Sequence, residues 1–230
     1  MISKILDSAA DAVRDIPDGS TVMIGGFGTA GQPVELIDAL LETGARNLTI
    51  VNNNAGNGTT GLAALLAARR VRKIICSFPR QVDSQVFDGL YRAGELELEL
   101  VPQGTLAERI RAGGADIAAF FTPTGFGTLL AEGKETRRFG GRDYVLENAL
   151  TADYALIKAH RGDRLGNLVY RKTARNFAPM MASAACISIV QVERIEEVGM
   201  LDPEAIVTPG IFVNRLVELG GKLPPATEGQ

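Results

Sequence analysis

A glycine-rich segment near the N-terminus, Gly26-Phe-Gly-Thr-Ala-Gly31, has the residue types and spacing of an anion-binding loop. It follows an apolar run and precedes Pro33, which suits the first turn of a helix. Glycines let the backbone approach a ligand, and a helix N-terminus favours negative charge. A dinucleotide site also needs an acidic residue after the next strand, where this chain has Asn52-Asn-Asn54. We therefore do not expect NAD, whereas a tight turn without a ligand remains an alternative.

Metal and triad chemistry have few residues available to them. The chain has one histidine, His160, and two cysteines, Cys76 and Cys186, with no Cys-x-x-Cys pair. A zinc site or a Ser-His-Asp triad would depend on that single imidazole ring. We expect His160 to pack or to form a hydrogen bond, and we expect no metal. Both cysteines lie in apolar runs, so we expect buried, reduced thiols.

Composition excludes several classes of partner. Lys and Arg number 24 against 27 Asp and Glu, and no run of five like charges occurs, so we expect no nucleic-acid binding. No apolar stretch is long enough to span a membrane. Residues 1–14 carry Asp7 and Asp11 and have no uninterrupted apolar core, which argues against a secretory signal. We expect a cytoplasmic protein.

Strand-like and helix-like segments alternate, which predicts an α/β fold with a mainly parallel sheet and helices on both faces. After residue 122 the pattern changes to glycine-rich and hairpin segments. We expect one domain over residues 1–222 and a flexible tail over 223–230. The expected strands are 21–24, 48–51, 73–77, 96–101, 117–121, 155–159, 168–171 and 187–192. The expected helices are 2–16, 33–44, 62–68, 84–93 and 178–185, and one that opens at the capping box Thr105-Leu-Ala-Glu108.

Polar loops follow four consecutive strands of the expected sheet. They span residues 25–32, 52–58, 77–81 and 102–104. Because ligands of parallel sheets bind beyond the carboxyl ends of the strands, we expect these loops to converge on one edge. That edge is the predicted functional site.

The segment Asp18-Gly-Ser-Thr-Val-Met-Ile-Gly-Gly-Phe-Gly-Thr-Ala-Gly-Gln-Pro33 resembles the signature of the A subunit of family I CoA-transferases, which implies a CoA-transferase/NagB-like fold. The resemblance extends from about residue 3 to about 217. Further matching blocks are 53–56, 101–110, 121–127, 131–134, 158–161, 166–167 and 174–177. Segments 77–81 and 161–172 are most similar to the branch of the family that acts on 3-oxoadipate.

The resemblance assigns roles to residues of the predicted edge. It implies that the glycine segment binds coenzyme A as co-substrate through Gly25, Gly26, Phe27, Gly28, Thr29, Ala30 and Gly31. Asn53 and Asn54 match a pair beside the substrate, where neutral amides can hold a carboxylate. Gln103 matches a glutamine near the thioester carbonyl, a position that suits an oxyanion donor.

The nucleophile of this family is a glutamate in a Ser-Glu-Asn-Gly motif on the B subunit. This chain lacks the motif, and its nearest string is Leu146-Glu-Asn-Ala149. We expect Glu147 to form a structural ion pair or hydrogen bond. The resemblance therefore implies that the chain is inactive alone, and that it pairs with a B subunit in an A2B2 assembly.

Substrate choice is the least determined property. The transfer of CoA from succinyl-CoA to 3-oxoadipate needs an anchor for a distal carboxylate, and Phe78 and Arg80 are our candidates because arginine binds carboxylates through two donors. A solvated Arg80 is the alternative. The basic cluster Arg161, Arg164, Arg171, Lys172 and Arg175 suits CoA phosphates, an acidic partner or plain solvation. Two other functions remain open, an acetoacetate- or butyrate-type transferase and a non-catalytic nucleotide-binding module.

Overall fold

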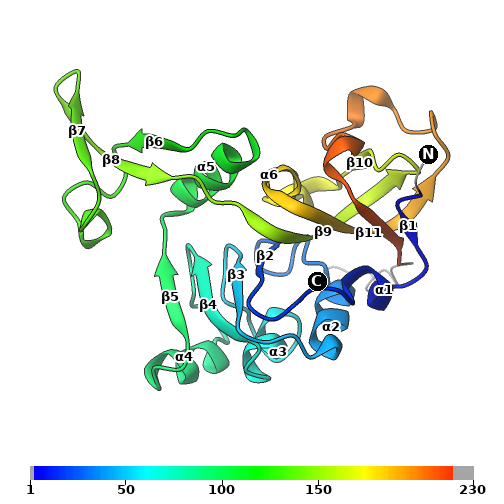
Figure 1. Cartoon of the computed structure of the whole chain (residues 1–230), viewed down its shortest axis with the longest axis horizontal. Helices are drawn as coiled ribbons and strands as arrows, with labels where there is room; N and C mark the ends of the chain where they lie inside the picture. The colour runs from blue at the N-terminus through cyan, green and yellow to red at the C-terminus, as the bar shows by residue number, and fades with distance from the viewer. Residues whose placement is uncertain (1–2, 220–230) are drawn as a thin grey trace, which may run out of the picture.

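A mostly parallel, nine-stranded β-sheet organises the chain (Figure 1). The computed structural model describes residues 3–219. The strand order is β1-β12-β11-β9-β2-β3-β4-β5, and β10 pairs antiparallel with β9. The strands of this sheet are β1 (Ile5–Leu6), β2 (Thr21–Ile24), β3 (Leu48–Val51), β4 (Val71–Cys76), β5 (Glu97–Leu100), β9 (Ala152–Asp163), β10 (Leu168–Val169), β11 (Ala185–Glu196) and β12 (Arg215–Glu218).

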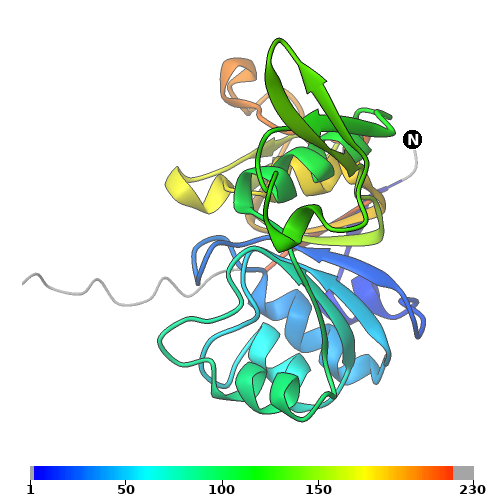
Figure 2. The same cartoon turned by 90° about the vertical axis from the view of Figure 1, so that its left-hand side faces the viewer.

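Helices cover both faces of the sheet, as the sequence predicts. They are α1 (Ala9–Val13), α2 (Val34–Thr43), α3 (Leu62–Ala67), α4 (Gln85–Arg92), α5 (Gln103–Gly114) and α6 (Ala178–Ala184). Figure 2 shows α1 to α4 in one layer and α5 with α6 in the other. Successive strand side chains point to opposite faces, so Ile74 packs with the first layer and Ile75 with the second. Both faces of the sheet are therefore packed against apolar side chains, which leaves the ends of its strands open to polar groups.

A separate three-stranded antiparallel sheet projects from the body (Figure 1). It consists of β6 (Ala119–Thr122), β7 (Thr136–Phe139) and β8 (Arg142–Asn148), in the order β6-β8-β7. The Phe139 ring makes edge-on contacts with Phe121 and Tyr144 on this sheet. Four short 3-10 helices complete the described elements: η1 (Leu129–Ala131), η2 (Lys172–Arg175), η3 (Pro203–Ala205) and η4 (Gly210–Phe212).

The prediction of a helix over residues 2–16 is wrong in its first half. Ile5 and Leu6 form β1, which pairs in parallel with β12. The helix begins only at Ala9, where the Ser8 hydroxyl oxygen accepts a hydrogen bond from the Asp11 N–H at 3.0 Å. Helical spacing in the sequence did not reveal the Ser8 cap, which starts the helix, or the pairing with β12, which makes Ile5 and Leu6 a strand.

The predicted capping box at Thr105 is also wrong. Helix α5 begins at Gln103, directly after the extended Pro102, so Thr105 already lies in the first helical turn. Its hydroxyl is buried without a hydrogen-bond partner among the described residues. Proline set the helix start here, because it cannot continue the strand ladder and its φ is ready for a helix. The predicted tail over 223–230 lies outside the described residues.

Candidate functional site

Three of the four predicted loops meet at the carboxyl edge of the sheet. The Gly28 N–H, after β2, donates to Asn54 Oδ1 at 3.0 Å. Asn54 Nδ2, after β3, donates to the Phe78 carbonyl at 3.1 Å in the loop after β4. Asn54 thus joins the glycine loop to the Phe78 segment, and the expected convergence of these loops is confirmed.

The asparagines after β3 form the framework of this edge. Asn53 and Asn54 are 1% and 5% exposed. Asn53 Oδ1 accepts from the Ser77 hydroxyl at 2.7 Å, and Asn53 Nδ2 donates to Asn54 Oδ1 at 3.2 Å. Asn52 Nδ2 donates to the Ile24 carbonyl at 2.6 Å. The amides therefore hold the loops together, and direct contact of Asn53 and Asn54 with substrate stays a prediction.

Gln103 lies at the same edge, one strand further along. It is the first residue of α5 and follows β5, which pairs with β4. Its side chain is exposed and makes no hydrogen bond within residues 3–219. An unengaged amide at a helix start is available to a ligand, but its role as an oxyanion donor stays a prediction.

Asn176 fastens the glycine loop to a distant segment of the chain. Its Oδ1 accepts from the Gly26 N–H at 3.1 Å, and its Nδ2 donates to the Ala30 carbonyl at 2.9 Å. It also binds its own segment, accepting from the Phe177 N–H and donating to the Thr173 carbonyl. We call this the Asn176 clamp. The sequence placed Asn176 only in a block of family resemblance, and no periodic pattern pointed to it.

The clamp needs a glycine at position 31. Gly31 has a φ of +74°, and a Cβ there would lie 2.3 Å from the Ala174 carbonyl oxygen. Both the left-handed backbone and the close approach exclude a larger residue. The last glycine of the motif thus serves close packing between two distant segments of the chain.

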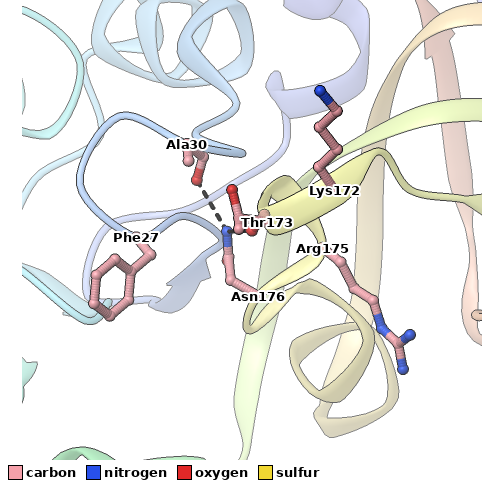
Figure 3. A pocket seen from close by; sticks show the side chains of 6 residues that line it. All are labelled: Phe27, Ala30, Lys172, Thr173, Arg175 and Asn176. Carbon is pink, nitrogen blue, oxygen red and sulfur yellow. Dashed lines mark hydrogen bonds between the residues drawn. The ribbon is translucent and has the colours of Figure 1, made fainter.

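A pocket of about 600 Å³ opens beside the clamp. Figure 3 shows Phe27 on one side, Lys172 and Arg175 on the other, and Thr173 and Asn176 between them. Phe27 is 48% exposed. The predicted CoA-binding loop therefore forms one wall of a real cavity, and the opposite wall is basic.

A second pocket, of about 580 Å³, opens in the loop that follows β4. It is lined by Phe78, Arg80, Gln81 and Val82. Arg80 Nε donates to Asp88 Oδ1 at 2.6 Å, and this contact engages one edge of the guanidinium. Arg80 is thus tethered at a pocket rim, and its contact with substrate stays a prediction.

The carboxylates that the structure buries are all engaged. Within residues 3–219 these are Glu147 and Asp163. Glu147, on β8, pairs with Lys134 at 2.6 Å, as the sequence predicted. Asp163 accepts from the backbone of a turn and from Asn167 Nδ2. His160 also has a structural partner, with its Nδ1 2.9 Å from Glu193 Oε2. Both buried acids are therefore engaged in contacts within the chain.

The two cysteines differ, which corrects one prediction. Cys76 is buried in β4, but Cys186 is exposed at the start of β11. The apolar run around Cys186 belongs to a strand whose alternate residues face outward, so its thiol reaches the surface. Burial raises the pKa of the Cys76 thiol to about 12.

We expect a thiol reagent at pH 8 to modify one cysteine of the native protein, Cys186, and both after unfolding, because the thiolate is the reactive form. Mass spectrometry after labelling measures which cysteines are modified. Rapid labelling of native Cys76 would contradict its burial.

The raised pKa of Cys76 also predicts that the free energy of unfolding falls above about pH 9, because only the unfolded chain then loses the Cys76 proton.

Residues 3–219 hold no group of three or more His, Cys, Asp or Glu side chains able to bind a metal ion. No helix in that range has the length and apolar character needed to cross a membrane.

Comparison with known proteins agrees with this geometry. The coenzyme A transferase family matches residues 6–219. A Pseudomonas putida protein, named as the A subunit of 3-oxoadipate CoA-transferase, is 67% identical over 221 residues, covering 96% of each chain. The A subunit of a succinyl-CoA:3-ketoacid coenzyme A transferase from Xanthomonas campestris is 54% identical over 211 residues, covering 92% of this chain and 86% of the relative.

Solved structures of other proteins share the fold. The glutaconate coenzyme A-transferase of Acidaminococcus fermentans superposes with a TM-score of 0.82 at 20% identity, over 94% of this chain and 75% of that one. This likeness confirms the predicted α/β architecture. The chain belongs to the coenzyme A transferase family, whose pattern it matches from residue 6 to residue 219.

Proposed function

We propose that this chain is the A subunit of a cytoplasmic CoA-transferase that moves CoA from succinyl-CoA to 3-oxoadipate. The observation that carries the proposal is the 67% identity, over nearly the whole of both chains, to the P. putida protein of that name. The identity to the 3-ketoacid type is lower, at 54%. The two free cysteines suit a reducing compartment.

The catalytic glutamate comes from a B subunit in this proposal. The B-subunit motif Ser-Glu-Asn-Gly is absent from the sequence, and both buried carboxylates have partners. The relatives are themselves named as A subunits. A B subunit seated over the carboxyl edge of the sheet would complete the site, and two such pairs would form an A2B2 tetramer.

The proposed reaction proceeds through covalent intermediates on the partner's glutamate. The partner's glutamate attacks the thioester carbonyl of succinyl-CoA, giving a mixed anhydride and CoA thiolate. The thiolate attacks the glutamyl carbonyl, releases succinate and leaves a glutamyl-CoA thioester. A 3-oxoadipate carboxylate then displaces the thiolate to form a second anhydride. The thiolate finally attacks the acyl carbonyl, giving 3-oxoadipyl-CoA and free glutamate.

This chain supplies binding and polarisation. In the proposal the Gly25–Gly31 loop holds CoA, and the exposed Gln103 amide donates to the oxyanion that develops at each carbonyl. Asn53 and Asn54 fix the loops beside the reacting carboxylates. Phe78 and Arg80 receive the far end of the dicarboxylate in their pocket. No metal and no NAD take part.

The test is a transferase assay with succinyl-CoA, using this chain alone, its partner alone and the mixture. We expect activity only in the mixture, and a higher kcat/KM with 3-oxoadipate than with acetoacetate. Preference for acetoacetate would move the assignment to the 3-ketoacid type. An inactive but verified complex would favour a non-catalytic nucleotide-binding module.

A further inference from the structure

The five basic residues of the cluster noted in the sequence differ in their surroundings in the structure. Arg161 and Arg164 have acidic neighbours on β11 and just beyond it, Glu196 at 3.7 Å and Glu197 at 2.8 Å. Lys172 and Arg175 have no carboxylate within 4.0 Å among residues 3–219. Only this second pair lines the pocket beside the glycine loop. Arg171, the fifth member of the cluster, also has no carboxylate within 4.0 Å among these residues, but it does not line this pocket.

The backbone that carries this pair is held in an uncommon conformation. Lys172 has a φ of +51°, in the left-handed region that a residue with a Cβ seldom adopts. The Asn176 clamp binds the same short segment at Thr173 and ties it to the glycine loop at Gly26 and Ala30. Such a conformation persists only where surrounding contacts enforce it, and here the Asn176 clamp holds the segment beside the glycine loop.

The arrangement of the pocket suits a phosphate ester better than a carboxylate. Lys172 and Arg175 extend in different directions from the short helix η2 (Figure 3). They therefore offer two separate contact points for anionic groups of a ligand and do not bind a single group together. Coenzyme A carries a pyrophosphate and a separate 3′-phosphate, and Arg and Lys bind phosphate oxygens strongly. The half-exposed Phe27 ring opposite gives an aromatic face for a base or an alkyl chain.

We propose that Lys172 and Arg175 form an anion subsite that takes the phosphate groups of coenzyme A. This inference rests on the proposed function and adds to it. It assigns the phosphate end of coenzyme A to the pocket at Phe27 and the dicarboxylate substrate to the pocket at Arg80.

The test compares two acyl donors in the assembled complex, succinyl-CoA and succinyl-pantetheine, which has no phosphate. The double variant Lys172→Gln and Arg175→Gln should raise the KM for succinyl-CoA about 10- to 100-fold, as expected for lost hydrogen bonds to charged groups. Its KM values for succinyl-pantetheine and for 3-oxoadipate should not change. The matched control is Arg171→Gln, because Arg171 is exposed on the same segment but does not line the pocket. That control should behave as the wild type.

An equal rise in KM for both donors, a rise for 3-oxoadipate alone, or no rise would overturn the subsite. Calorimetric binding of CoA to the complex separates this outcome from the proposed function, because it needs no turnover. Weaker CoA binding by the double variant, in a complex that catalyses no transfer, would support the subsite and refute the function. Unchanged CoA binding by the double variant would refute the subsite in either case.

Discussion

Replacing Asn176 by alanine is expected to lower the kcat/KM of the assembled enzyme about 100-fold, the cost typical of a misplaced binding loop. The substitution removes the acceptor for the Gly26 N–H and the donor to the Ala30 carbonyl. The glycine loop then loses its tether to the segment that carries Lys172 and Arg175. Asn176 is a positioning residue in this account, and steady-state kinetics on the variant complex measure its effect.

Asn167 provides the matched control. It also holds two parts of the chain together, accepting from the Gly210 N–H and donating to Asp163, but it does not touch the glycine loop. Asn167→Ala should lower stability and leave kcat/KM unchanged. If both variants lost stability alone, the Asn176 clamp would be a structural contact without a role in catalysis.

The Asn54→Ala variant is expected to lose about 1–3 kcal/mol of unfolding free energy, because it leaves two partly buried backbone groups without their hydrogen-bond partners. These are the Gly28 N–H and the Phe78 carbonyl. Loss of the junction should also lower kcat, since it separates the loops that line the two pockets. Denaturant unfolding of the variant chain measures the first effect, and kinetics of the complex measure the second.

Asn57 serves as the comparison on the same loop. It is exposed, and its Oδ1 accepts one hydrogen bond from the Asp83 N–H at 2.8 Å. Asn57→Ala should cost less than about 1 kcal/mol, the usual worth of one exposed contact. An Asn54→Ala variant of normal stability with a raised KM for 3-oxoadipate would instead indicate that Asn54 mainly contacts substrate.

The sheet and its functional edge were predictable because they depend on local patterns. Short apolar strands such as Leu48–Val51 were followed by polar loops, and parallel strands bring such loops to one edge. The β4 and β5 strands, α2 and α6 all appeared within a few residues of their expected bounds. Gly44 ends α2 in a left-handed conformation, as its position after the apolar run predicted.

The features that sequence reasoning missed depend on contacts between distant residues. Ile5 and Leu6 form a strand only because β12, more than 200 positions later, offers a parallel edge. Asn176 reaches the glycine loop across 150 positions. The pairing of Arg164 with Glu197, which separates it from Lys172, is likewise a tertiary contact. Local periodicity and spacing carry no information about such partners.

We propose that a partner subunit supplies the nucleophile to a site of which this chain forms only one side. The most direct measurement traps the covalent intermediate. The complex is incubated with succinyl-CoA, the bound thioester is reduced or fragmented in place, and peptide mass spectrometry locates the modified residue. We predict a modified glutamate on the partner chain and none on this one. A modified carboxylate on this chain, at Glu147 or elsewhere, would contradict the account.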